Sequence, residues 1–190
     1  MANTNAPLGL RPVRHVSGGA VRISDKYSIA TGYTSDIFTG DPVQMTGTGK
    51  NIELAEAGNV DNIGVFVGCR YVNAAGEQIF SKYWPNTTTA TDIVALVVDD
   101  PNVEFEIQAD TIAEASVGQL VDWAAGTGSA TTGMSGAYAD LTTGTATTGK
   151  ALRIMGLVDR PDNAYGAYAK IRVMYAEHVL GRVVAGVGGI

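Results

Sequence analysis

Cysteine, histidine and long apolar runs are scarce in this sequence of 190 residues. The single cysteine, Cys69, excludes an internal disulfide framework, and its place in the apolar run from Ile63 to Val72 predicts a buried thiol. His15 and His178 are the only histidines, so the clustered His and Cys ligands of a zinc site are missing. No segment has the roughly 20 consecutive apolar residues that span a bilayer, and the first residues lack the features of a signal peptide. We therefore expect a protein made in a cytoplasm, with no metal, no cofactor and no membrane partner.

Acidic residues outnumber basic ones, and the two kinds are unevenly distributed. The formal net charge is −6, from 13 Lys and Arg against 19 Asp and Glu. Residues 1–24 hold Arg11, Arg14 and Arg22 and no acid, which leaves 10 basic and 19 acidic groups, or −9, for the remainder. An acidic body argues against nucleic-acid binding, which needs a basic patch to offset phosphate charge. The three arginines either dock on acidic groups of another subunit or are simply solvated.

The most regular pattern runs from Thr91 to Asp110. Ile93 to Val98 is a continuous apolar run, typical of a strand buried on both faces. Val103 to Gln108 alternates apolar and polar residues, which predicts a strand with one face in water. Asp99-Asp100-Pro101-Asn102 between them is typical of a turn. We therefore expect the two strands to pair as a hairpin.

Short strands and turns recur along the chain, and no helix of ordinary length is indicated. Residues 1–24 contain proline and glycine without periodicity, which predicts an extended N-terminal arm. Residues 126–150 are dominated by Gly, Thr, Ala and Ser and predict a flexible excursion. The rest of 25–190 predicts one mainly β domain, a β-barrel, β-tulip-like fold or sandwich. Further strands are expected at residues 25–33, 42–45, 52–57, 63–72, 77–84, 118–124, 151–158 and 168–178.

Several patterns resemble catalytic or ligand motifs but lack the required context. Gly144 to Lys150 fits most of the phosphate-loop pattern, but Ala151 stands where a Ser or Thr would hold magnesium. A catalytic triad would have to use His15 or His178, and no nucleophile-elbow pattern occurs. The residues therefore predict no enzyme. Five aromatic residues could stack on sugars or fill the core: Tyr33, Tyr71, Tyr83, Trp84 and Trp123.

Several short sequence motifs, here called phrases, occur along the chain from its start to its end. In content and order they resemble the head decoration, or cement, proteins of tailed bacteriophages, especially a group common in phages of marine bacteria. The phrases are Gly9-Leu10-Arg11-Pro12-Val13-Arg14, Gly40-Asp41-Pro42-Val43, Ile63-Gly64-Val65-Phe66, Asp99-Asp100-Pro101, Phe105-Glu106-Ile107-Gln108-Ala109-Asp110, Arg160-Pro161-Asp162-Asn163 and the closing Gly189-Ile190.

The resemblance implies a non-enzymatic virion protein, made in the bacterial host, that binds the outer surface of the expanded capsid. Its partners would be the major capsid protein and itself, as homotrimers at three-fold and quasi-three-fold positions. The implied fold is a small β-barrel or β-tulip, or a jelly roll. On this hypothesis Arg11, Arg14 and Arg22 form a capsid-docking arm, and trimer contacts include Trp123, Val184, Val187 and Ile190. The alternative function is a carbohydrate-binding or adhesin module on the virion surface.

Overall fold

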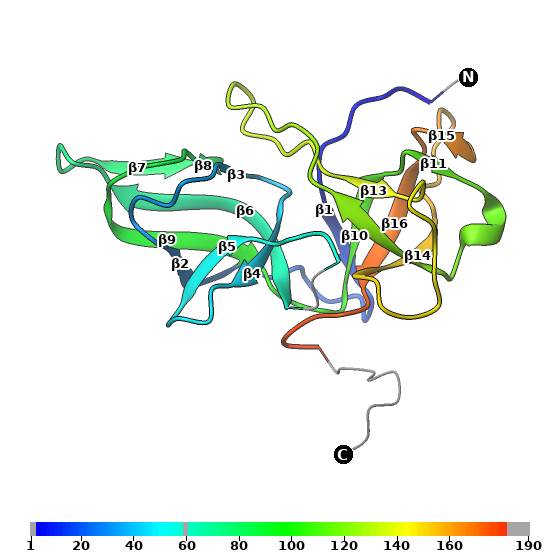
Figure 1. Ribbon diagram of the computed structural model, residues 1–190, viewed down its shortest axis with the longest axis horizontal. Helices are drawn as coiled ribbons and strands as arrows, with labels where there is room; N and C mark the ends of the chain where they lie inside the picture. The colour runs from blue at the N-terminus through cyan, green and yellow to red at the C-terminus, as the bar shows by residue number, and fades with distance from the viewer. Residues whose placement is uncertain (1–2, 59–60, 182–190) are drawn as a thin grey trace, which may run out of the picture.

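The computed structural model describes residues 3–58 and 61–181, and these form an all-β structure. A single 3-10 turn, η1 (Glu114–Ser116), is the only helical element in these two ranges. Two groups of strands lie side by side (Figure 1): a closed barrel from the N-terminal half, and a second sheet built mainly from the C-terminal half. The mainly β prediction is confirmed, and the strands form two hydrophobic clusters.

The barrel has five strands and is mixed, because one of its pairs is parallel. The strand order is β4-β5-β2-β9-β6, and a further pairing of β4 with β6 closes the ring. β2 and β5 pair in parallel, and the other pairs are antiparallel. The strands are β2 (Ser24–Ile29), β4 (Pro42–Met45), β5 (Asn51–Leu54), β6 (Asn62–Val72) and β9 (Thr91–Val98). Outside the ring, β7 (Gln78–Ser81) pairs with β6, and β3 (Ile37–Phe38) pairs with β8 (Tyr83–Trp84).

Apolar residues of these strands fill the barrel. Phe66 on β6 and Trp84 on β8 are fully buried in the hydrophobic cluster of this half. The strands predicted at residues 63–72 and 77–84 form, and they pair antiparallel as β6 with β7. The register of β6 against β9 shifts between Phe66 and Gly68, which is the bulge that a glycine inside the strand predicts.

The second sheet has the order β1-β10-β16-β14-β12-β13, and all its pairs are antiparallel. One face packs on a core that includes Phe105, Ile154 and Ile171. The strands are β1 (Arg11–His15), β10 (Val103–Gln108), β12 (Leu120–Ala124), β13 (Tyr138–Asp140), β14 (Leu152–Leu157) and β16 (Lys170–Tyr175). A small pair, β11 (Thr111–Ile112) with β15 (Gly166–Ala167), lies beside this sheet (Figure 1).

The predicted hairpin between the strands on either side of Asp99 to Asn102 is wrong. β9 pairs with β2 and β6 in the barrel, whereas β10 pairs with β1 and β16 in the second sheet. The turn itself forms as expected, with the Asn102 N–H donating to Asp100 Oδ1 at 2.8 Å. It carries the chain from one sheet to the other.

The N-terminal segment is built into the second sheet over part of its length. Arg11–His15 form the edge strand β1, antiparallel to β10, and Leu10 before it is 1% exposed. The Ala6 N–H donates to Gln108 Oε1 at 2.7 Å. Residues 3–15 therefore lie along their own chain, and residues 16–23 link β1 to the barrel.

Residues 126–150 include the edge strand β13 of the second sheet, and the loop before that strand bonds to Thr39 beside β3. The Thr39 N–H donates to the Gly133 carbonyl at 3.0 Å, and the Ser135 N–H donates to the Thr39 carbonyl at 2.9 Å. Ala137 and Ala139 are fully buried. The predicted excursion is thus attached at several points.

Candidate functional site

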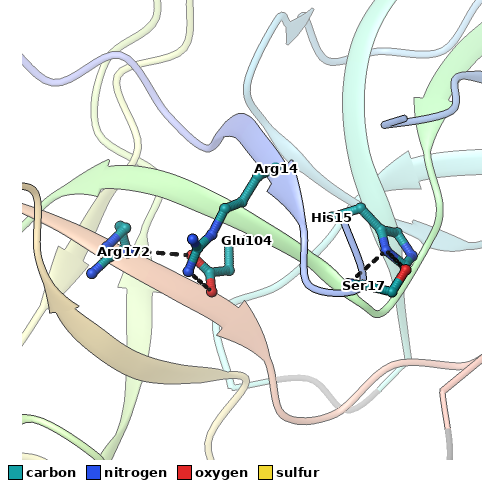
Figure 2. Close-up of polar contacts among 5 residues, drawn as sticks. All are labelled: Arg14, His15, Ser17, Glu104 and Arg172. Carbon is teal, nitrogen blue, oxygen red and sulfur yellow. Dashed lines mark hydrogen bonds and ion pairs between the residues drawn. The ribbon is translucent and has the colours of Figure 1, made fainter. Parts of the chain in front are cut away.

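Arginine and glutamate side chains meet on the face of the second sheet that points away from its core. Arg14 on β1 stands opposite Glu104 on β10, and its Nε and Nη2 donate to the two carboxylate oxygens, each at 2.9 Å. Arg172 on β16 lies 3.7 Å from the same carboxylate (Figure 2). Hydrogen bonds from Arg14 hold the pKa of Glu104 below its ordinary value. Glu104 therefore stays charged although its side chain is only 5% exposed.

The other polar residues of β10 are covered in a similar way. Glu106 Oε2 accepts a hydrogen bond from Arg160 Nη2 at 2.8 Å. The Gln108 amide nitrogen donates to Asn5 Oδ1 at 2.8 Å. All six residues of β10 are buried, so the predicted face in water is wrong. The polar residues lie where expected, but arginines and the N-terminal segment cover them.

The three arginines of the predicted docking arm have different surroundings. Arg14 is in the ion pair with Glu104. Arg11 is exposed and stands opposite Glu106 across β1 and β10, on the same sheet face as Arg14. Arg22 is exposed in the link between β1 and β2. The structure thus brings Arg11 and Arg14 together and leaves Arg22 outside the sheet.

Phrases that carry the family resemblance meet where the barrel contacts the second sheet. The Leu10 N–H donates to the Gly40 carbonyl at 2.9 Å, and the Gly40 N–H donates to the Phe66 carbonyl at 2.8 Å. A Cβ on Gly9 would lie 2.5 Å from the Gly40 oxygen. A Cβ on Gly64 would collide with the Val98 carbonyl oxygen. We call these residues the junction: Gly9, Leu10, Gly40, Asp41, Gly64, Phe66, Val98 and Asp99.

Asp99 and Asp100, in the turn between β9 and β10, contact residues at the two ends of the segment that links β1 to β2. Asp99 Oδ2 accepts hydrogen bonds from Lys26 Nζ at 2.8 Å and the Tyr27 hydroxyl at 2.9 Å. Burial alone would raise the pKa of Asp99, but these bonds outweigh it and lower the pKa. Asp100 Oδ2 lies 3.0 Å from His15 Nε2 at the end of β1. Both carboxylates therefore serve structural contacts.

His15 also contacts Ser17, so the two nitrogens of its ring connect a serine to an aspartate. Ser17 Oγ lies 2.7 Å from His15 Nδ1 (Figure 2), and Asp100 contacts the other ring nitrogen. The Ser17 backbone N–H also donates to His15 Nδ1, at 3.1 Å. The Gly18 N–H donates to the His15 carbonyl at 2.9 Å. The arrangement closes a turn, and it also offers Ser17 a proton acceptor.

The second histidine lies at a cleft of about 800 Å³ beside the end of β16. His178 is 5% exposed, and burial lowers its pKa. Residues 147–149, from the segment that resembles a phosphate loop, also line this cleft. Lys150 Nζ bonds to Asp122 Oδ2 at 3.0 Å, so the lysine of that segment pairs with a carboxylate of its own chain.

The large aromatic residues singled out in the sequence are mostly internal. Trp84 is fully buried, Trp123 is 3% exposed and Tyr71 is 8% exposed, so these three present no stacking surface. Trp123, assigned above to trimer contacts, packs in the core of the second sheet. Cys69 is 2% exposed, and burial raises the pKa of its thiol to about 12, which confirms the predicted buried thiol. Val184, Val187 and Ile190 lie outside the described residues.

The C-terminal strands bring further cations, not predicted from the sequence, to the same sheet face as Arg11 and Arg14. Lys170 and Arg172 on β16 alternate with buried Ile171 and Val173. This alternation with a period of two predicts from the sequence alone that both cations lie on one face of the strand. Their position near β1, with only β10 between the two strands, depends on strand order and could not be predicted from the sequence.

Residues 3–58 and 61–181 contain no group of three or more His, Cys, Asp and Glu placed to hold a metal ion. In the same part of the chain no helix has the length and apolar character of a membrane span. Comparison with known protein families, curated proteins and solved structures found no match.

Proposed function

We propose that this chain is a structural virion protein that binds the outer surface of a mature phage capsid and stabilises it. One observation carries the proposal: four of the seven phrases that resemble cement proteins contribute residues to the junction. Gly9, Gly40 and Gly64 come from three separate phrases, and each one allows a close backbone approach there. Phrases that act together in one packed unit support a common architecture better than scattered matches would.

The exposed strand edge offers a physical means of docking. β1 is the edge strand of the second sheet, the position at which another chain can add a strand. Val13 is 49% exposed, and Val16 is 55% exposed just after this strand. A surface of this kind, placed across several shell subunits, would stabilise the assembled shell by mass action, because it binds that state alone. Homotrimers at three-fold positions would multiply the effect by avidity.

Co-sedimentation with purified expanded capsids tests the proposal. Wild-type protein should saturate the shells, and the charged variant V13D/V16D should lower its apparent affinity at least about tenfold, because desolvating a carboxylate at an apolar contact is costly. Phe80→Asp is the matched control, since Phe80 is 73% exposed on β7 in the barrel. Wild-type protein that does not bind shells at any salt concentration would end the proposal.

The trimer is tested separately. Sedimentation velocity of the free protein and a count of copies at each three-fold position on decorated shells should both give three. A two-fold or single-copy arrangement on the shell would contradict the trimer and leave capsid binding in place.

The contacts of His15 favour acyl transfer as a second candidate function. In such a reaction Ser17 Oγ would bond to the acyl carbon of an ester, its proton would pass to His15 Nδ1 and then to the departing alcohol, and water would release the acid. A fluorophosphonate probe followed by peptide mass spectrometry decides the matter. Selective labelling of Ser17 that disappears in His15→Gln would support this candidate, whereas labelling no faster than that of exposed Ser129 would exclude it.

A further inference from the structure

Cations gather on the outward face of the second sheet although the protein as a whole is acidic. Arg14 lies opposite Glu104, Lys170 lies opposite Gln108, and Arg153 lies opposite Met174, so these pairs share one side of the sheet. Arg172 and Arg11 are both opposite Glu106, from β16 and β1. We call this surface the basic face: Arg11, Arg14, Arg153, Lys170 and Arg172.

The charge on this face is not balanced by its own carboxylates. Two further cations, Arg160 and Lys150, pair with carboxylates of this face. The seven cations then meet four carboxylates, which leaves three positive charges, while the whole chain carries −6. The carboxylates are Glu104, Glu106, Asp122 and Asp140. Glu104 is paired with Arg14, and Glu106 is paired with Arg160 from the loop after β14. On neighbouring β12, Asp122 is paired with Lys150. The positive charge of Arg11, Arg153 and Lys170 is therefore available to a partner.

Apolar side chains lie among these cations. Met155 on β14 is 39% exposed, and Val13 in the bulge of β1 is 49% exposed. Arginine and methionine are enriched at protein interfaces, because both combine apolar area with adaptable geometry. A phosphate backbone would gain nothing from the apolar groups. The combination favours a protein partner over a nucleic acid.

We propose that the basic face is a docking surface for an acidic protein segment. Acidic side chains would complement the positive charge that this face carries across β1, β10, β16 and β14. The inference rests on the proposed function in one respect: on a capsid, that segment would belong to the shell subunit. Long-range attraction between opposite charges speeds encounter and orients the partner, and close arginine–carboxylate pairs then hold it. The Glu104 carboxylate lies 2.9 Å from Arg14 and 3.7 Å from Arg172, so it helps to orient both guanidinium groups on this face.

The test uses the full chain and poly-L-glutamate as the acidic probe, with duplex DNA of equal charge as the comparison. The test variant is Arg11→Glu/Lys170→Glu, because neither residue forms one of the ion pairs described above. The matched control is Lys50→Glu/Arg70→Glu, which makes the same charge change in the barrel, also at one exposed and one half-buried residue. Circular dichroism confirms that both variants are folded.

We expect wild-type and control proteins to bind poly-L-glutamate and the test variant to bind at least about tenfold more weakly. Raising the salt from about 0.1 M to about 1 M should weaken wild-type binding strongly, since the screening length falls from about 10 Å to about 3 Å. No binding to poly-L-glutamate, an equal loss in both variants, or DNA bound as tightly as poly-L-glutamate would overturn the inference. Capsid binding that stays unchanged in the test variant would overturn it too, while the proposed function would stand.

Discussion

Replacing Gly64 by alanine should separate the effect of the junction from that of ordinary glycine strain. Gly64 has φ +144, and a Cβ there would lie 2.9 Å from the Val98 carbonyl carbon and 3.0 Å from Asp99 Cα. Both are backbone atoms, so no side-chain rotation can make room. Strained backbone costs about 1–3 kcal/mol, and overpacking costs about 1–3 kcal/mol more. We expect Gly64→Ala to lower the free energy of unfolding by about 4 kcal/mol.

Gly76→Ala provides the control. Gly76 has φ +81 in the turn between β6 and β7, and a Cβ there would have no heavy atom within 4 Å. This variant should lose only the cost of the left-handed conformation, about 1–2 kcal/mol. Urea unfolding followed by circular dichroism measures both values, since the free energy falls linearly with urea. If Gly64→Ala were as stable as Gly76→Ala within about 0.5 kcal/mol, the close approach at the junction would be refuted.

The Gly64 carbonyl accepts a hydrogen bond from the Tyr175 hydroxyl of β16 at 3.0 Å, so Gly64 also contacts the second sheet. The two tryptophans therefore allow the same variant to test the contact between barrel and second sheet. Trp84 is buried in the barrel, and Trp123 is buried in the core of the second sheet. With Trp123→Phe the fluorescence reports the barrel, and with Trp84→Phe it reports the second sheet. We expect coincident urea transitions when Gly64 is present and separate transitions in Gly64→Ala. Coincident transitions in both backgrounds would show that Gly64 does not hold the two parts together.

Three further predictions follow from burial and charge. Glu104 has a lowered pKa in the folded protein, so its ion pair with Arg14 stabilises the fold at pH values above the ordinary pKa of 4.5. That stability is lost as the pH falls through the lower, folded pKa. In urea titrations at pH 2–6, Glu104→Gln should therefore make the free energy of unfolding depend less on pH. The Cys69 thiol should react with a disulfide reagent at pH 8 only after urea unfolds the chain, and fast reaction of the native protein would contradict its burial. Phe105→Ala should cost about 3–5 kcal/mol in urea unfolding, whereas Phe80→Ala should change stability by less than about 0.5 kcal/mol, since Phe105 is fully buried and Phe80 is 73% exposed; similar costs would contradict the core assignment.

Local patterns predicted most of the strands. The apolar run at residues 63–72 became β6, the longest strand of the barrel, and the run before Asp99 became β9. The turn at residues 99–102 is closed locally, because the Asp100 side chain accepts a hydrogen bond from the Asn102 N–H. In each case the signal lies within a few residues, where side-chain period and backbone chemistry act directly.

The same patterns did not predict which strands would pair. Adjacent strands with a good turn between them usually form a hairpin, but β9 and β10 entered different sheets. Periodicity tells which residues share a face and does not name the neighbour of the strand. The prediction that one face of β10 lies in water was wrong for the same reason. Arg14 is 90 residues from Glu104 in the sequence, and it covers Glu104 only because β1 pairs with β10.

The sequence by itself determined an all-β chain with one buried thiol, an acidic balance and a basic start, because composition and short-range periodicity are local properties. Only the tertiary structure decided that Arg11 and Arg14 would stand beside Arg153, Lys170 and Arg172. Strand order depends on how distant apolar faces are buried together, which is a property of the whole chain. The basic face and the junction both come from that step.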